Sequence, residues 1–301
     1  MQWIKKNTKL KLKKKILIVG ELIIDRSYKI KNIGTSLETK NPKYFIEQVK
    51  EEMGGAGKVF YSINKISKNK SIFITSRNYK SKIFNKENIC FFESKIPNIE
   101  KNRFWENKKK IIQLNKDYKK NYTQTIFFNK FLLKILKKNI NKINTIIISD
   151  YNHGLINKNI IVGIKKLCKN KKIDIYVDKQ IRSENEFPNY YTNLDYLIIN
   201  QLEFKLLKIK YKLKGDSINC LENLKSKLKF KNIVLKRGKN GSCMITNNNA
   251  FFKAKSFIGK KKVNVSGAGD HFLAMFASLN NDMNPQKRLL YSNRWASNNL
   301  D

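Results

Sequence analysis

The sequence is short of acidic residues, proline and histidine. Its 301 residues include 23 Asp and Glu against 63 Lys and Arg, which gives a formal net charge of +40. With 4 Pro and 13 Gly, it has little material for long flexible linkers. The hydrophobic fraction of 41% and the aromatic fraction of 11% are typical of a folded globular protein. We therefore expect one domain spanning residues 1–301.

Long apolar runs and paired cysteines are also missing. The run Ile16–Ile24 is short and carries Glu21, so it predicts a buried strand and neither a signal peptide nor a membrane span. The cysteines stand far apart, without C-x-x-C or Cys/His ligand spacing: Cys90, Cys168, Cys220 and Cys243. We interpret them as reduced thiols and expect a cytoplasmic protein with no membrane partner.

The excess of positive charge has two interpretations. A balance of this size favours a polyanion such as nucleic acid as partner. The lysines, however, are scattered through every segment beside Asn and Ile, which indicates a bias of the whole composition and solvated surface lysines. We favour the second interpretation, expect no specific nucleic-acid partner, and keep polyanion binding as an alternative.

Apolar β-rich runs alternate with amphipathic helical runs along the chain. Strands are expected near Ile16–Val19, Ser71–Thr75, Thr145–Ser149, Asp174–Val177, Tyr196–Ile199 and Asn232–Leu235. Helices are expected near Val59–Ile66, Phe127–Ile143, Asn159–Cys168, Glu203, Ile218–Leu228 and Phe272–Leu279. Continuously apolar strands that alternate with helices predict an α/β fold whose mostly parallel sheet is covered on both faces.

Two polar segments interrupt this alternation, at about 26–50 and 90–118. Both contain alternating apolar positions, for example Phe91, Ile96 and Ile99. The pattern predicts short strands outside the main sheet, which would form a small β flap.

The motif with the clearest chemistry is Asn264-Val-Ser-Gly267-Ala-Gly269-Asp270, directly before an apolar helical run. Glycines allow a tight turn that presents bare N–H groups, and the following helix directs its positive end to the same point. Such a cradle suits the negative charge that develops during phosphoryl transfer. Asp270 could accept the proton of an attacking hydroxyl. Taken alone, the motif could equally be a loop with a capping Asp.

Further polar residues stand where the predicted strands end. Asn200 and Glu203 follow one strand and could hold a hydrated Mg²⁺, or simply cap a helix. Asp25, Asp150 and Asp178 follow three others. Because open α/β sheets bind ligands at the carboxyl ends of their strands, we expect these side chains to share one site.

These motifs together resemble the ribokinase-like (PfkB) carbohydrate kinases. The resemblance is carried by Gly20-Glu21 with Asp25-Arg26, by Gly54-Gly55, by Asn200-x-x-Glu203 and by Gly267-Ala-Gly-Asp270. Shorter stretches resemble the kinase domain of bacterial heptose-phosphate kinases: Asp25-Arg26, Lys101-x-Arg103, Ile112-Gln-Leu, Ser149-Asp150-Tyr151 and Val177-Asp178-Lys179. The chain is too short to contain the nucleotidyltransferase domain that often accompanies those kinases.

The resemblance implies a ribokinase-like three-layer sandwich with a small β lid, and transfer of the ATP γ-phosphoryl group to a sugar with the help of Mg²⁺. The favoured acceptor is the 1-hydroxyl of a heptose 7-phosphate. Asp270 would be the base, and Gly267, Ala268 and Gly269 the anion hole. Asn200 and Glu203 would order the metal, and Lys236, Arg237, Gly238 and Gly241 would lie near the nucleotide. The candidate substrate contacts are Asp25, Gly54, Gly55, Lys58, Arg103, Asp150 and Lys179.

Four positions depart from the family's usual residues, and they keep alternatives open. Glu21 and Asn264 stand where Asp is usual, Lys58 where a sugar-binding Asn is usual, and His271 where a small hydroxylic residue is usual. Lys58 could contact a phosphorylated sugar or mark a lapsed site. A kinase for another sugar or a nucleoside, and a non-catalytic binding protein of the same fold, therefore remain alternatives. By analogy, a homodimer through the lid is also expected.

Overall fold

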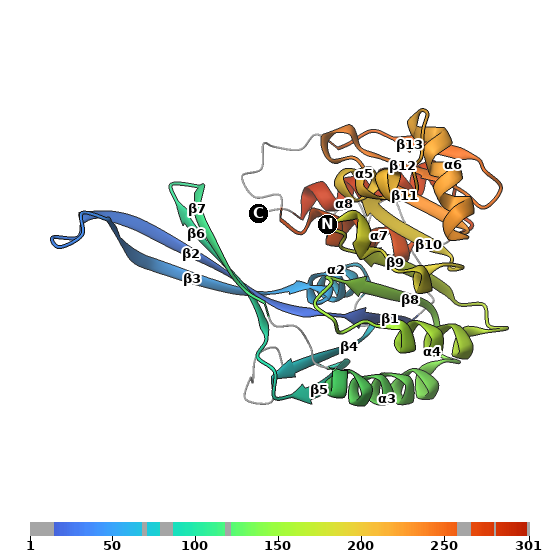
Figure 1. The fold of residues 1–301 in the computed structure, drawn as a ribbon, viewed down its shortest axis with the longest axis horizontal. Coiled ribbons are helices and arrows are strands. Elements are labelled where there is room, and N and C mark those ends of the chain that lie inside the picture. The colour runs from blue at the N-terminus through green and yellow to red at the C-terminus, as the bar shows by residue number, and fades with distance from the viewer. Residues whose placement is uncertain are drawn as a thin grey trace.

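The computed structural model describes residues 15–67, 71–78, 87–117, 122–257, 266–279 and 281–299, the side chains of 122–124 excepted. Asn264 lies outside these residues. Within them, nine strands form the main sheet in the order β13-β12-β11-β10-β9-β8-β1-β4-β5 (Figure 1). The strands are β1 (Lys15–Gly20), β4 (Ser71–Asn78), β5 (Ile89–Ser94), β8 (Ile143–Asp150), β9 (Asp174–Lys179), β10 (Tyr196–Asn200), β11 (Asn232–Lys236), β12 (Ser242–Ile245) and β13 (Phe251–Ala254).

Most of this sheet is parallel. Only the pairs β11–β12 and β12–β13 are antiparallel. The central strands are apolar on both sides because helices cover both faces: Ile146, Ile147 and Ile148 on β8 are all fully buried. The expected mostly parallel α/β sheet is therefore confirmed.

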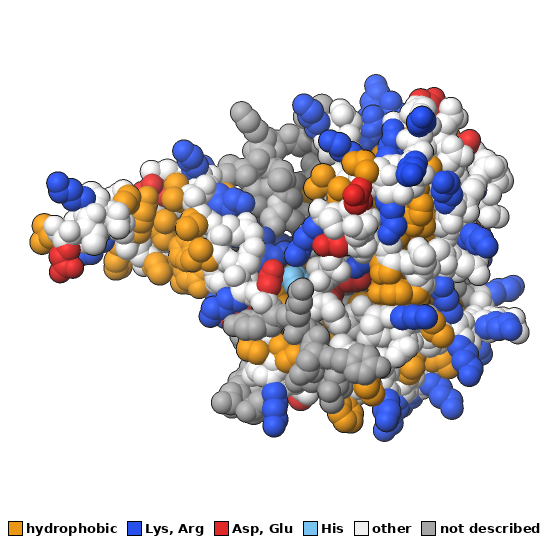
Figure 2. Space-filling model, in the orientation of Figure 1, with side chains coloured by type: hydrophobic (Ala, Val, Ile, Leu, Met, Phe, Trp, Pro, Cys, Tyr) orange, Lys and Arg blue, Asp and Glu red, His pale blue; other side chains and the backbone are white. Residues whose placement is uncertain are grey.

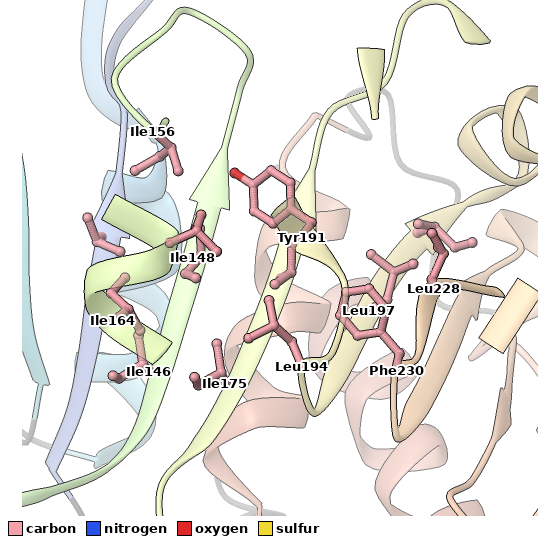
Figure 3. Packing of buried hydrophobic residues seen from close by; sticks show 14 of the residues in the cluster. Ile146, Ile148, Ile156, Ile164, Ile175, Tyr191, Leu194, Leu197, Leu228 and Phe230 are labelled. Carbon is pink, nitrogen blue, oxygen red and sulfur yellow. The ribbon is translucent and has the colours of Figure 1, made fainter. Parts of the chain in front are cut away.

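The helices divide into two layers. Leu17 and Val19 of β1 face a core with α3 (Tyr122–Asn139), α4 (Lys158–Cys168), α5 (Gln201–Lys210) and α6 (Ser217–Leu228). Ile16 and Ile18 face a core with α2 (Ala56–Ser67) and α7 (Ala268–Ser278), against which α8 (Pro285–Asn298) also packs. The single-turn helices are η1 (Glu184–Glu186), η2 (Asn189–Tyr191) and η3 (Gly238–Asn240). Figure 3 shows part of the first core, where Ile146 and Ile148 lie toward Ile164 of α4. The architecture is the expected three-layer sandwich.

A second sheet has the order β3-β2-β6-β7 and extends away from the body as an arm (Figure 1). Its strands are β2 (Leu22–Thr35), β3 (Pro42–Gly55), β6 (Ile99–Glu106) and β7 (Lys109–Lys116). The lid segments expected from the sequence need two corrections. Ile89–Ser94 is a parallel edge strand of the main sheet, so the second lid segment begins at β6. β2 and β3 are also long, with 14 residues each, because they pair along most of their length.

Helix boundaries differ slightly from the sequence-based expectation. α3 ends at Asn139, and Ile143, expected as its last residue, already belongs to β8. The apolar pattern continues across the turn between the two elements, which is why it did not mark the boundary.

The distribution of positive charge and the state of the cysteines agree with the interpretation of the sequence. Figure 2 shows Lys and Arg spread over the visible face of the body, without a single stripe. The four cysteines are all free. No helix among the described residues is long and apolar enough to cross a membrane.

Candidate active site

The carboxyl ends of the central strands bring the expected polar residues to one edge. Gly20 of β1 pairs with Ser149 of β8, and Ser149 in turn pairs with Asp178 of β9. On the other side, Asn200 of β10 pairs with Lys236 of β11. Because these strands are parallel and in register, the residues that follow them meet at the same edge of the sheet.

Asp270 lies in the first turn of α7, which Gly267 caps at its N-terminus with φ +84°. Its carboxylate Oδ1 accepts a hydrogen bond of 2.5 Å from the hydroxyl of Tyr151. Burial raises the pKa of Asp270 to about 6, although the Tyr151 hydrogen bond and the charges of Lys236 and Lys58 act against this shift. A carboxylate with this pKa is ionised at neutral pH and still basic enough to accept a proton from a hydroxyl.

Tyr151 is a site residue that the sequence reasoning did not single out, although it belongs to the stretch Ser149-Asp150-Tyr151. Its position depends on Glu21, one of the departures from the family pattern. The Glu21 carboxylate accepts hydrogen bonds from the backbone N–H of Tyr151 at 2.9 Å and from that of Leu155 at 3.3 Å. Burial, followed by the charge of Asp150, raises the pKa of Glu21 to about 7. Glu21 therefore fixes the turn that presents Tyr151 to Asp270.

A small cavity of about 120 Å³ lies beside Asp270 and Tyr151. Its lining combines the lid root, the glycine pair and the start of α7: Ile23, Asp25, Gly54, Gly55, Lys58, Lys101, Arg103, Tyr151, Ser266, Gly267 and Asp270. Five of the expected substrate residues are thus brought together with the expected base. Arg103 forms an ion pair with Asp25, which fixes both side chains at the cavity wall.

Steric constraints explain why positions 54 and 55 are both glycine. Gly55 has φ +61°, and a Cβ there would lie 2.6 Å from the carbonyl oxygen of Glu21. A Cβ at Gly54 would lie 3.2 Å from the Cβ of Asp25. A side chain at either position would therefore displace the backbone or the carboxylate that faces the cavity.

Lys101 is a second cavity residue that sequence reasoning did not assign. Its ammonium lies 5.3 Å from the centre of the Tyr151 ring. Burial lowers the pKa of Lys101, and the charge of Asp270 partly offsets that effect. The signal for it was present in Lys101-x-Arg103, because alternate residues of one strand share a face of the sheet.

Asp150 and Lys179 lie beneath the cavity and do not line it. Both are 2% exposed, and their side chains form an ion pair of 2.9 Å. The hydroxyl of Tyr191 donates to Asp150 at 2.6 Å, and Lys179 also donates to Asn152 at 2.9 Å. Because these groups already satisfy one another, we interpret the pair as a support of the loop after β8 and not as the expected substrate contact.

Asn200 and Glu203 form a reciprocal capping box at the start of α5. The Glu203 carboxylate accepts from the Asn200 backbone N–H at 2.8 Å, and the Asn200 side chain accepts from the Glu203 N–H at 3.0 Å. Burial raises the pKa of Glu203 to about 7, with Asp178 adding to the shift and Lys236 opposing it. A cation nearby would favour its ionised form.

The described residues hold no group of three or more His, Cys, Asp or Glu side chains that could cage a metal. The residues fit a Mg²⁺ ion that arrives with the phosphates of ATP and needs one or two protein carboxylates at most. Glu203, which lies near Asp178, is the carboxylate that the sequence predicts for this role.

The predicted nucleotide loop follows β11. Gly238 and Gly241 both have positive φ, +54° and +79°, and a Cβ on Gly241 would lie 2.1 Å from the carbonyl oxygen of Ala254. Arg237 also borders a larger hollow of about 590 Å³ along α5, which none of the residues around Asp270 lines. The loop therefore has the tight backbone that a phosphate approach needs, but its contact with a nucleotide stays a prediction.

The two histidines of the chain do not line the cavity that contains Asp270. His271 is buried, and its Nδ1 lies 3.0 Å from the Ser62 hydroxyl, which also accepts from Trp295 Nε1 at 2.8 Å. This network joins α2, α7 and α8, which is consistent with a tolerated neighbour of the base. His153 is 4.0 Å from Asp117 and does not line the cavity.

Comparison with known proteins identifies the class. The family model of the pfkB family carbohydrate kinases matches residues 107–297. The matched residues make up more than half of the chain, so it belongs to this family of carbohydrate kinases. Among solved structures, it resembles ribokinase from Arabidopsis thaliana, with a TM-score of 0.68 and 14% identity over 94% of this chain and 91% of that one. This likeness confirms the ribokinase-like fold.

The curated relatives share about a quarter of their aligned residues with this chain. The chain is 24% identical to the bifunctional protein HldE of Aliarcobacter butzleri (strain RM4018), over 93% of this chain and 60% of that protein. It is 27% identical to an uncharacterized sugar kinase of Buchnera aphidicola subsp. Schizaphis graminum (strain Sg), over 94% of this chain and 89% of that protein. The chain thus spans about three fifths of the HldE protein.

Proposed function

We propose that this kinase phosphorylates a heptose 7-phosphate at its 1-hydroxyl and so forms a 1,7-bisphosphate. The observation that carries the proposal is the cavity beside Asp270, where Lys58, Lys101 and Arg103 meet around a space of about 120 Å³. A sugar that carries a second anionic group would suit this lining better than a neutral sugar. The similarity to HldE and the short stretches that resemble heptose-phosphate kinases support the same substrate class.

Lys101 is the favoured contact for the existing phosphate. Arg103 is already paired with Asp25, whereas the ion pairs among the described residues include none to Lys101. Lys101 is partly buried, and an ammonium that loses part of its hydration without a paired carboxylate is costly, so an anionic ligand would reduce that cost. Lys101 also lies over the ring of the tyrosine that contacts the base, so a phosphate bound there would orient the sugar toward Asp270.

The proposed chemistry uses Asp270 as the general base. The sugar hydroxyl replaces the Tyr151 hydroxyl at the carboxylate and loses its proton to Asp270 as its oxygen attacks the γ-phosphorus. The backbone N–H groups after Gly267, at the positive end of α7, bind the oxygens that gain charge. A Mg²⁺ ion bound to ATP would neutralise phosphate charge, and Glu203 and Asn200 are the residues that would hold it.

The test is turnover of Mg²⁺-ATP by the purified protein with a panel of sugars, sugar phosphates and nucleosides that includes heptose 7-phosphate. We expect turnover with the heptose 7-phosphate, and a loss of at least 100-fold in Asp270→Asn with ATP binding unchanged. Lys101→Met should raise KM for the phosphorylated sugar about tenfold or more and leave KM for ATP unchanged. Preference for a neutral sugar or a nucleoside would refute the substrate, and ATP binding without turnover on any acceptor would favour the non-catalytic alternative.

We also propose that a second copy of the chain covers the lid. The arm carries large apolar side chains that are at least 40% exposed: Ile33, Leu37, Phe45, Ile46, Val49, Ile111, Ile112 and Leu114. Figure 2 shows hydrophobic side chains gathered along this arm. Exposed apolar patches of this kind mark interaction surfaces. Phe45→Glu should halve the mass measured by light scattering, and a wild-type protein that is monomeric at micromolar concentration would refute the proposal.

A further inference from the structure

Two lysine side chains approach the backbone of the Gly267–Gly269 turn. A Cβ built on Gly267 would lie 2.4 Å from Cδ and 3.1 Å from Nζ of Lys58. A Cβ built on Gly269 would lie 3.3 Å from Nζ of Lys236. Gly267 needs its positive φ in any case, but no such φ accounts for Gly269. Its missing side chain leaves space for the Lys236 ammonium at the start of α7.

Lys236 is an anchored cation. It ends β11, and its ammonium donates to Asp178 at 2.8 Å. Although burial acts in the opposite direction, the charges of Asp178 and Glu203 raise the pKa of Lys236 above its ordinary value. It therefore stays protonated beside three carboxylates, those of Asp178, Glu203 and Asp270.

Lys58 approaches from the acceptor side. It lies in the first turn of α2, its side chain is 14% exposed, and its ion pair with Glu52 of β3 is long, at 3.6 Å. It lines the cavity that contains Asp270 and Gly267, and its charge lowers the pKa of Asp270. The Lys58 ammonium is thus held close to the Gly267–Gly269 turn and forms only a weak ion pair with Glu52.

The two helices that begin here, α2 and α7, add the positive ends of their dipoles to the two ammonium groups. A place with this much positive charge, next to a general base and an acceptor cavity, suits a group that carries negative charge on several oxygens. During phosphoryl transfer that charge spreads over the three equatorial oxygens of the group in transit.

We propose that Lys58 and Lys236 are catalytic residues that hold the transferring phosphoryl group from opposite sides of the Gly267–Gly269 turn. The inference rests on the proposed function and gives Lys58 a role in the reaction itself, separate from recognition of the sugar's own phosphate. As the acceptor oxygen forms its bond to the γ-phosphorus, the bond from that phosphorus to the β,γ-bridging oxygen breaks and ADP leaves. The acceptor proton passes to Asp270, and neither lysine takes part in the proton transfer.

The test compares Lys58→Met and Lys236→Met with Lys65→Met, which removes an exposed ammonium two turns further along α2. We expect each of the first two to lower kcat about 100-fold or more, with KM for ATP within about threefold of the wild type. The acid limb of the pH profile should move to higher pH, because both charges lower the pKa of Asp270. Because any charge at that place would move the limb, the loss of kcat at high pH, where Asp270 is ionised in every variant, is the readout that assigns the catalytic role. Lys65→Met should behave as wild type.

Binding of ADP with aluminium fluoride, which mimics the phosphoryl group in transit, gives a second measurement that needs no acceptor. The two variants should lose at least 100-fold of this affinity while binding ADP alone as the wild type does. If either Met variant fails to fold by circular dichroism, the Gln variant replaces it. Unchanged kcat, or unchanged affinity for ADP with aluminium fluoride, would refute the inference even where the wild type is active. A wild type without turnover on any acceptor would instead refute the proposed function, and the aluminium fluoride measurement would still decide the role of the lysines.

Discussion

Tyr151→Phe should move the acid limb of the pH profile of kcat/KM to higher pH. The Tyr151 hydroxyl donates at 2.5 Å to Asp270, and this hydrogen bond is the strongest influence that lowers the pKa of that buried carboxyl. A hydrogen bond to a charged group contributes about 1.5 kcal/mol or more, which corresponds to roughly one pH unit. With Asp270 at a pKa of about 6 in the wild type, a shift of that size would reduce kcat/KM about fivefold at pH 6. At pH 9 Asp270 would be fully ionised in both proteins, and their values of kcat/KM should agree.

The control is Tyr211→Phe, which removes a buried hydroxyl that makes no hydrogen bond among the described residues. It should leave the profile unchanged. Rates are measured from pH 5 to pH 9 with the acceptor well below KM, so that they report the ionisation of the enzyme before the acceptor binds. An equal loss at every pH would refute the reasoning, since it would mean that Tyr151 positions the acceptor and does not stabilise the ionised base.

Two further predictions concern stability. Glu21→Gln should flatten the pH dependence of the free energy of unfolding. The pKa of Glu21 is raised from 4.5 to about 7 in the folded state, so its contribution to stability is fully present below pH 4.5 and is lost as the pH rises through 7. The difference is about 3 kcal/mol. Urea titrations at pH 4.5 and pH 8 measure this difference in the free energy of unfolding, and a variant with the same pH dependence as the wild type would contradict it. Lys179→Met should destabilise the protein by about 3–5 kcal/mol, because it leaves the carboxylate of Asp150 buried without its cation. The double variant with Asp150→Asn should recover much of that loss, and a double variant as unstable as the single one would show that packing, not charge, holds the loop.

The α/β architecture could be predicted from the sequence because its signal is local. Strands such as Ile146–Ile148 are apolar on both sides, and this pattern already specifies a sheet covered on both faces. The position of Ile89–Ser94 could not be predicted in the same way. Its pattern of partly buried residues fits an edge strand of either sheet, and only its parallel pairing with β4 assigns it to the main one.

The candidate site was predictable where a motif combines a backbone requirement with a chemical group. Gly267 with Asp270, and Gly54 with Gly55, are of this kind, and the structure brings them to one cavity. Tyr151 and Lys101 were missed because an aromatic ring and a lysine carry no signal of their own in a chain with 63 Lys and Arg. For Lys179 the error was of another kind: a basic residue at a strand end can face the ligand or a buried carboxylate, and the sequence does not distinguish the two.

The site also shows where a chain with a net charge of +40 places its few acidic side chains. Six of its 23 acidic residues, Glu21, Asp25, Asp150, Asp178, Glu203 and Asp270, lie at or beneath this one edge of the sheet. Three of them have a pKa raised by burial to between about 6 and 7, so each ionised carboxylate there costs folding free energy. The lysines of the site face these carboxylates directly, Lys236 at Asp178 and Lys179 at Asp150. Positive charge that is merely solvated elsewhere on the surface thus stabilises the ionised acids at the site, and the same charge is in place to receive a phosphoryl group.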